Sequence, residues 1–182
     1  WRDIEATGEA NADLSALEGA TQLIARREDA MIFYGVKSLG VKGLVNAAGV
    51  GTQKRSDWSA GEGAFSDIAA AIATLGQNNC FGNYTLVMSL DLYVQLQRIQ
   101  QWTGLLESYR IRQLLEGRLF ASPVLQPKTA VLLCAQQQYM DLLVGQDFVT
   151  AYAELVDLNH HLRVLETALP RIKEPKAIVV FK

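Results

Sequence analysis

The segment 13–46 shows the clearest periodicity of hydrophobic and polar residues in the chain. Apolar side chains recur every three or four positions along one arc of a helix, at Leu14, Leu17, Ala20, Ile24 and Met31. Polar side chains occupy the opposite arc, at Ser15, Glu18, Gln22, Arg26 and Asp29. This spacing predicts a long helix, with Asp13 as its N-cap, that packs one face and turns the other to solvent or to a partner.

Three glycines follow this predicted helix. Gly35 occupies the position where a helix C-cap adopts the left-handed conformation, and Gly40 and Gly43 follow within GVKSLGVKGLVN. Glycines this close to a helix end predict a turn whose backbone is approached closely by other segments. An ordinary core helix followed by a loop is the alternative interpretation.

The next part of the chain alternates between helical and extended patterns. The segment 46–64 is rich in Gly, Ser and Ala and predicts a surface loop. The elements predicted after it are a helix over 65–75, a buried strand over 84–90, a helix capped by Asp91, an interruption at 100–104 and a helix over 105–115.

From Arg118 onward the pattern becomes that of β-strands. The segments are RLFASPVL, AVLLCAQ, YMDLLVGQ, DFVTAYAELV, HLRVLETAL and AIVVFK. Helices first and strands later predict an α+β fold with a mostly antiparallel sheet, rather than a doubly wound α/β fold.

Composition narrows the class of protein. The chain has 182 residues, 49% of them hydrophobic and 20% charged, which suits one large globular domain or two small ones. A net charge of −2 gives no bulk attraction to nucleic acid or to an anionic membrane, and we expect neither as a partner. We see no apolar run of membrane-spanning length and no leader. Two cysteines, Cys80 and Cys134, are too few for a disulfide framework, so we expect a reducing, cytoplasmic setting.

The sequence contains little chemistry for catalysis. His160 and His161 are adjacent in a predicted strand, where neighbours face opposite sides and cannot easily share a metal ion. No HExxH, GxSxG or Cys/His cluster occurs, and Cys134 lies in an apolar run typical of inert core packing. We therefore predict no metal site, no cofactor and no enzymatic activity.

Asp147 is the polar residue that stands out. In LLVGQDFVTAY, Gly145 interrupts an apolar run, and Asp147 and Phe148 place a charge beside an aromatic ring. A bulge or turn in which Asp147 caps backbone amides is the plain structural interpretation.

Four segments, in order along the chain, resemble the encapsulins, which are prokaryotic shell proteins with the HK97-type fold of tailed-phage major capsid proteins. They are the helix and glycine turn of 11–46, FGNYTLVMSLDLY at 81–93, LLVGQDFVTAY at 142–152, and the terminal PKAIVVFK. The resemblance implies a peripheral domain containing the long spine helix (1–46), a mainly axial domain (47–140) and strands returning to the peripheral domain (141–182). Encapsulins carry an N-terminal helix and an extended loop before this point, so we expect the chain starting at Trp1 to be truncated or processed.

The resemblance also implies two functional sites. The strand with Asp147 would dock a C-terminal targeting peptide of a cargo protein: Asp147 would pair with a basic residue, and Phe148 and Tyr152 would offer apolar contact. The family also uses its N-terminal helix in that pocket. The second site is a loop around the five-fold pore, formed by Gln100, Gln101, Trp102, Thr103 and Gly104. A Gln/Thr lining predicts weak ion selectivity, and Trp102 packed against the core is the alternative.

The function implied by the resemblance is structural. We expect a shell subunit that self-assembles into an icosahedral nanocompartment of about 60 copies or a multiple. The expected cargo is a ferritin-like protein or a dye-decolorising peroxidase, for iron storage or defence against oxidative stress. A phage or prophage major capsid protein is the first alternative, and a bacteriocin-like or protease-labelled relative is the second.

Overall fold

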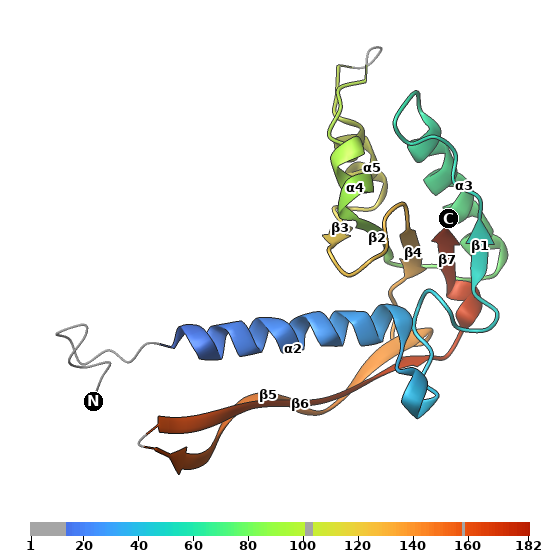
Figure 1. The fold of residues 1–182 in the computed structure, drawn as a ribbon. Helices are drawn as coiled ribbons and strands as arrows, with labels where there is room; N and C mark the ends of the chain where they lie inside the picture. The colour runs from blue at the N-terminus through green and yellow to red at the C-terminus, as the bar shows by residue number, and fades with distance from the viewer. Residues whose placement is uncertain (1–13, 101–103, 158) are drawn as a thin grey trace. The chain divides into compact units, whose positions relative to one another are not determined.

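The computed structural model describes residues 14–100, 104–157 and 159–182, and these form parts of two compact units. The first unit contains the described residues up to Asp29 together with Leu143–Leu169, and the second contains Ala30–Leu142 and Pro170–Lys182. Figure 1 shows the helices and strands with their labels. The assignment of the chain's segments to the peripheral and axial domains of a shell subunit stays a prediction.

The second unit is built on a five-stranded sheet in the order β1-β7-β4-β2-β3. Its strands are β1 (Gly51–Gln53), β2 (Tyr84–Ser89), β3 (Leu119–Ser122), β4 (Ala130–Cys134) and β7 (Ile178–Phe181). β4 pairs antiparallel with β2 and β7, whereas β1–β7 and β2–β3 are parallel. The sheet is therefore mixed, and the expectation of a mostly antiparallel sheet is corrected. Every residue of β4 is buried, which explains its uninterrupted apolar sequence.

The described residues of this unit also form three helices that lie wholly within it and two short 3-10 turns. They are α3 (Gly63–Gln77), α4 (Leu90–Gln95), α5 (Glu107–Leu114), η1 (Lys37–Leu39) and η2 (Pro175–Ala177). The predicted helices 65–75 and 105–115 and the predicted strand 84–90 are confirmed to within a few residues. The prediction of Asp91 as an N-cap is wrong. β2 runs directly into α4, so Ser89 occupies the cap position, and Asp91 in the first turn accepts a hydrogen bond from the backbone N–H of Lys128 (3.0 Å).

The segment 46–64 is more than the predicted surface loop. It contains β1, and Trp58 is fully buried with its ring edge-on to Phe181, the centroids 5.4 Å apart. The three residues of β1 are too few to show an alternating pattern. The small polar residues around Trp58 do not predict its burial, because the strand that packs against it, β7 with Phe181, comes from the end of the chain.

The glycine turn after α2 (Ser15–Tyr34) has the close approach that its sequence predicts. Gly35 has φ of +73° and Gly40 of +68°, both in the left-handed region. The chain then folds back on the helix end, where the backbone N–H of Leu44 donates to Ile32 (2.9 Å). A Cβ on Gly43 would overlap backbone atoms at the end of α2, so this position has room only for glycine.

The first unit combines most of α2 with a long hairpin, as Figure 1 shows. The hairpin strands are β5 (Met140–Val156) and β6 (Asn159–Ile172), so two segments predicted as separate strands form one continuous β5. Leu17, Ala20 and Ile24 are half-buried, which confirms most of the predicted packed arc of the helix, although Leu14 is exposed. Asp13 lies outside the described residues.

Candidate functional site

Three contacts between β5 and β6 establish how the two strands of the hairpin pair. They are the ion pair of Asp141 with Arg171, the approach of Gly145 to Thr167, and the ring contact of Tyr152 with His160 at 5.9 Å between centroids. All three fit a single antiparallel register along the hairpin. Gly145 therefore lies inside a regular strand and forms no turn, and the structural alternative of a bulge or turn at this point is corrected.

The three predicted docking residues lie on the same strand but not on the same face. Neighbours in a strand point to opposite sides, so Phe148 and Tyr152 share one face of β5 and Asp147 lies on the other. Phe148 is 38% exposed and Tyr152 is 58% exposed. The Asp147 carboxylate accepts a hydrogen bond from the backbone N–H of Phe148 (2.7 Å), so the expectation that this side chain holds a backbone amide is confirmed.

Four carboxyl groups of the first unit lie near one another. Burial raises the pKa of Glu28 on α2, and repulsion from Glu166, Asp29 and Asp147 raises it further. A side-chain hydrogen bond joins Glu28 to Glu166 of β6. Burial also raises the pKa of Asp29. The negative potential that these groups create would favour a basic side chain, and it depends on α2 and the hairpin packing together, which local sequence does not reveal.

The predicted pore loop stands on a narrow antiparallel stem in the second unit. Ile99 and Leu106 form an isolated bridge, the backbone N–H of Gln100 donates to Leu105 (2.9 Å), and that of Glu107 donates to Arg98 (3.1 Å). We refer to residues 98–100 and 104–107 as the stem.

The structure describes only the two ends of the predicted pore loop. Gly104 is exposed with φ of +66°, and its backbone N–H donates to Gln100 (2.9 Å). The Gln100 side chain is 7% exposed, so it belongs to the packed stem rather than to an open surface of this chain. Gln101, Trp102 and Thr103 lie outside the described residues.

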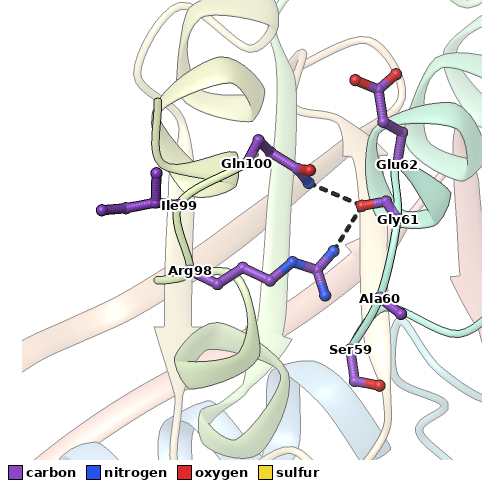
Figure 2. Close-up of a pocket in the computed structure, with 7 residues that line it drawn as sticks. All are labelled: Ser59, Ala60, Gly61, Glu62, Arg98, Ile99 and Gln100. Carbon is purple, nitrogen blue, oxygen red and sulfur yellow. Dashed lines mark hydrogen bonds between the residues drawn. The ribbon is translucent and has the colours of Figure 1, made fainter. Parts of the chain in front are cut away.

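A cavity of about 350 Å³ lies between the first arm of the stem and the loop that precedes α3. Its lining comes from residues 59–62 and 98–100, and Figure 2 shows Arg98 and Gln100 both reaching the carbonyl of Gly61. Each of these donations is 2.8 Å long. Arg98 also forms an ion pair with Glu107, whose side chain is fully buried. Our sequence reasoning missed this pair, and its only signal was two opposite charges flanking the predicted loop.

Other candidate groups offer no site. In the part of the chain that the structure describes, no cluster of three or more His, Cys, Asp or Glu residues could hold a metal ion. Cys80 and Cys134 are free and buried, and burial raises the pKa of both thiols, which makes them poor nucleophiles. His160 and His161 are exposed. None of the described helices is long and apolar enough to cross a membrane.

Comparison with known proteins decides the family. The family model described as encapsulating protein for peroxidase (Linocin_M18) matches residues 1–169. The chain belongs to the encapsulin family. The resemblance in its four sequence segments is confirmed.

Two relatives of this encapsulin chain are longer than the chain itself. The type 1 encapsulin shell protein EncA of Myxococcus xanthus is 43% identical over 180 residues, which are 98% of this chain and 63% of EncA. A diheme-cytochrome-encapsulin shell fusion protein of Kuenenia stuttgartiensis is 36% identical over 179 residues, which are 97% of this chain and 49% of the relative. The chain thus spans about half to two thirds of these relatives.

A solved virus-like particle from Pyrococcus furiosus has the same fold as this encapsulin chain. The TM-score is 0.82 at 20% identity, covering 99% of this chain and 72% of the other. At that identity the likeness concerns the fold alone. The expected capsid-protein fold of α+β class is therefore confirmed.

Proposed function

We propose that this encapsulin chain forms part of a shell subunit that self-assembles into an icosahedral compartment around a cargo protein. The observation that carries the proposal is the family match over residues 1–169. Closed symmetry of this kind uses about 60 copies or a multiple. The subunit acts as a building block and not as an enzyme, which agrees with the structural role named for the relatives.

The cargo is an enzyme of redox or iron chemistry. The family description names a peroxidase as the encapsulated protein, and the Kuenenia relative joins a diheme cytochrome to a shell protein. A dye-decolorising peroxidase or a ferritin-like protein fits this pattern, in defence against oxidative stress or in iron storage. The compartment is cytoplasmic.

Cargo docks through its C-terminal targeting peptide on β5. Phe148 and Tyr152 present exposed aromatic surface on one face, and Asp147 adds negative charge on the other. A peptide lying on one face would reach only one of these groups. A peptide running along the edge of β5 would pass side chains of both faces, because its own side chains alternate in the same way. Docking along the edge would therefore let one peptide contact all three residues, although they lie on two faces of β5.

The loop 100–104 borders the five-fold pore of the shell. The narrow stem places Gln100 and Gly104, the two described ends of the loop, side by side. Neutral Gln and Thr side chains at the tip would make the pore weakly selective among ions.

Negative-stain electron microscopy of the purified full-length protein tests the shell proposal. Uniform hollow particles that contain protein and no nucleic acid are expected. A discrete monomer or dimer would contradict the proposal, and particles filled with DNA would indicate a phage-type capsid protein instead. Mass spectrometry of the co-purifying protein identifies the cargo.

Site-directed variants of the full-length protein test the docking strand. Phe148→Ala with Tyr152→Ala, and Asp147→Ala separately, should each leave shells intact and lower the amount of cargo per shell severalfold. Leu165→Ala is a matched control, since Leu165 is 42% exposed and lies on the partner strand β6 rather than on β5. Unchanged cargo loading in the Asp147 variant would restrict the site to the aromatic face, and unchanged loading in all variants would refute it.

A further inference from the structure

The stem of the predicted pore loop contains a buried charge with a single partner. The Glu107 side chain is fully buried and pairs with Arg98, which is 24% exposed. A buried carboxylate without a cation is strongly unfavourable, so Glu107 can remain in this place only while Arg98 stays beside it. The pair joins the two arms of the stem, because Arg98 precedes the loop and Glu107 follows it.

The same pair also attaches the stem to the loop that precedes α3. Nη2 of Arg98 donates to both the Glu107 carboxylate and the Gly61 carbonyl, and Nε2 of Gln100 donates to that carbonyl as well. The carbonyl oxygen of Gly61 thus accepts hydrogen bonds from two side chains of the first arm (Figure 2). The second arm is tied to the same point through Glu107.

Among the described residues, Arg98 is the one cation paired with the Glu107 carboxylate. Nη1 of Arg98 and Oε1 of Glu107 are buried without a hydrogen-bond partner. Loss of Arg98 would therefore leave the fully buried Glu107 carboxylate uncompensated. An exposed ion pair, in contrast, is replaced by water at little cost.

We propose that Arg98 and Glu107 are positioning residues that hold Gln100 and Gly104, the two described ends of the predicted pore loop, in place. The pair does so by fixing both arms of the stem to Gly61. The assignment of this role to a pore rests on the proposed shell function. We call the attachment of both arms of the stem to Gly61 through Arg98 and Glu107 the lock. Its assignment rests on the contacts within the chain.

Hydrogen exchange of the full-length protein tests the lock. Glu107→Gln keeps the size of the side chain and removes its charge. The backbone amides of Gln100, Gly104 and Glu107 should then exchange at least about tenfold faster, while the amides of β4 keep their protection. Unchanged exchange at these three amides would overturn the lock.

Two further variants keep this test decisive. Glu116→Gln removes the ion pair with Arg118, in which Glu116 is 77% exposed, and should leave exchange in the stem unchanged. If Glu107→Gln does not fold, Arg98→Lys retains the positive charge but not the forked geometry of the guanidinium. It should accelerate the same three amides, and slow exchange there would contradict the proposal.

Solute entry into assembled shells tests the role in the pore. The rate at which a small quencher reaches a fluorophore on the cargo should change at least about twofold in Glu107→Gln, with shell diameter unchanged. Equal rates together with faster exchange would overturn the pore role. If the full-length wild type forms no shells, the proposed function fails, and hydrogen exchange still decides the lock.

Discussion

The indole N–H of Trp58 donates a 2.8 Å hydrogen bond to the carboxylate of Asp67 on α3. The same carboxylate oxygen accepts from the backbone N–H and the hydroxyl of Ser56, at 2.8 Å and 2.7 Å. One acidic side chain thus holds the segment that follows β1, and it places the Trp58 ring against Phe181 in the core. Burial of a large aromatic residue and satisfaction of its polar atom occur together.

Trp58 should be among the most important residues for stability. We expect Trp58→Ala to lower the free energy of unfolding by about 3–5 kcal/mol, because it leaves a large cavity beside Phe181. Asp67→Asn should cost about 1–3 kcal/mol by weakening the hydrogen bonds of Ser56 and Trp58. Urea denaturation followed by circular dichroism measures both. Asp57→Asn is the control, since Asp57 bonds only Ser59 among the described residues, and a cost as large as that of Asp67→Asn would contradict this account.

Replacing glycine by alanine should have opposite effects on stability at Gly43, in the turn after α2, and at Gly19, within α2. Gly43→Ala would force a Cβ into the backbone at the end of α2 and should cost about 1–3 kcal/mol. Gly19→Ala, in the exposed interior of α2 with open space around it, should stabilise by about 0.5–1 kcal/mol. Thermal unfolding of the two variants measures the difference. Equal effects would show that the turn adapts to a side chain.

Glu28 should make the first unit less stable at neutral pH than at mildly acid pH. Its pKa is raised by burial first and then by Glu166, Asp29 and Asp147, so the folded state binds its proton more tightly than the unfolded state does. Stability from this group is therefore fully present below its ordinary pKa of 4.5 and is lost as pH rises through the higher folded value.

Glu28→Gln removes that loss. We expect the variant to exceed the wild type by up to about 1 kcal/mol at pH 7 and to match it near pH 4. Denaturation curves at several pH values provide the comparison. Glu18→Gln, an exposed position on the same helix, should give no gain at pH 7. A Glu28→Gln variant no more stable than the wild type at pH 7 would refute the repulsion.

Asp141 should have the opposite pH dependence. Hydrogen bonds from Arg171, and then from Lys173, hold the pKa of its carboxyl far below its ordinary value of 3.8. Stability from a depressed acid is present above the ordinary value and is lost as pH falls through the folded value. Asp141→Asn should therefore melt below the wild type at pH 7, and the gap should narrow below about pH 4. Glu154→Gln is the control within β5, and a gap that persists unchanged to pH 2 would contradict this role for the ion pairs.

Strand β5, which we predict to dock cargo, shows how far sequence reasoning reached at the candidate site. The sequence pattern indicates a break at Gly145, and such a break conceals the regular alternation that separates Asp147 from Phe148 and Tyr152. Alternation is a local property of a strand, so the separation could have been predicted once the segment was treated as continuous. The packing of Glu28 against Glu166 could not, since it depends on α2 meeting the hairpin.

The local elements of this encapsulin chain follow from short-range patterns in its amino-acid sequence. Periodicity specifies α2, α3 and β2, and the left-handed backbone at Gly35 and Gly40 follows from what a residue without Cβ permits. These features depend on residues a few positions apart, whose steric preferences act before any distant segment arrives.

How those elements combine depends on contacts between segments that are far apart in the chain. The parallel pairing of β1 with β7, the burial of Trp58 beneath Phe181, and the attachment of Arg98 and Glu107 to Gly61 each join distant segments of the chain. Apolar burial stabilises the packing of Trp58 on Phe181, and at Arg98 and Glu107 the attraction of opposite charges and the hydrogen bonds offset the cost of removing the charges from water. Both depend on which surfaces meet, and a one-dimensional pattern leaves that choice open.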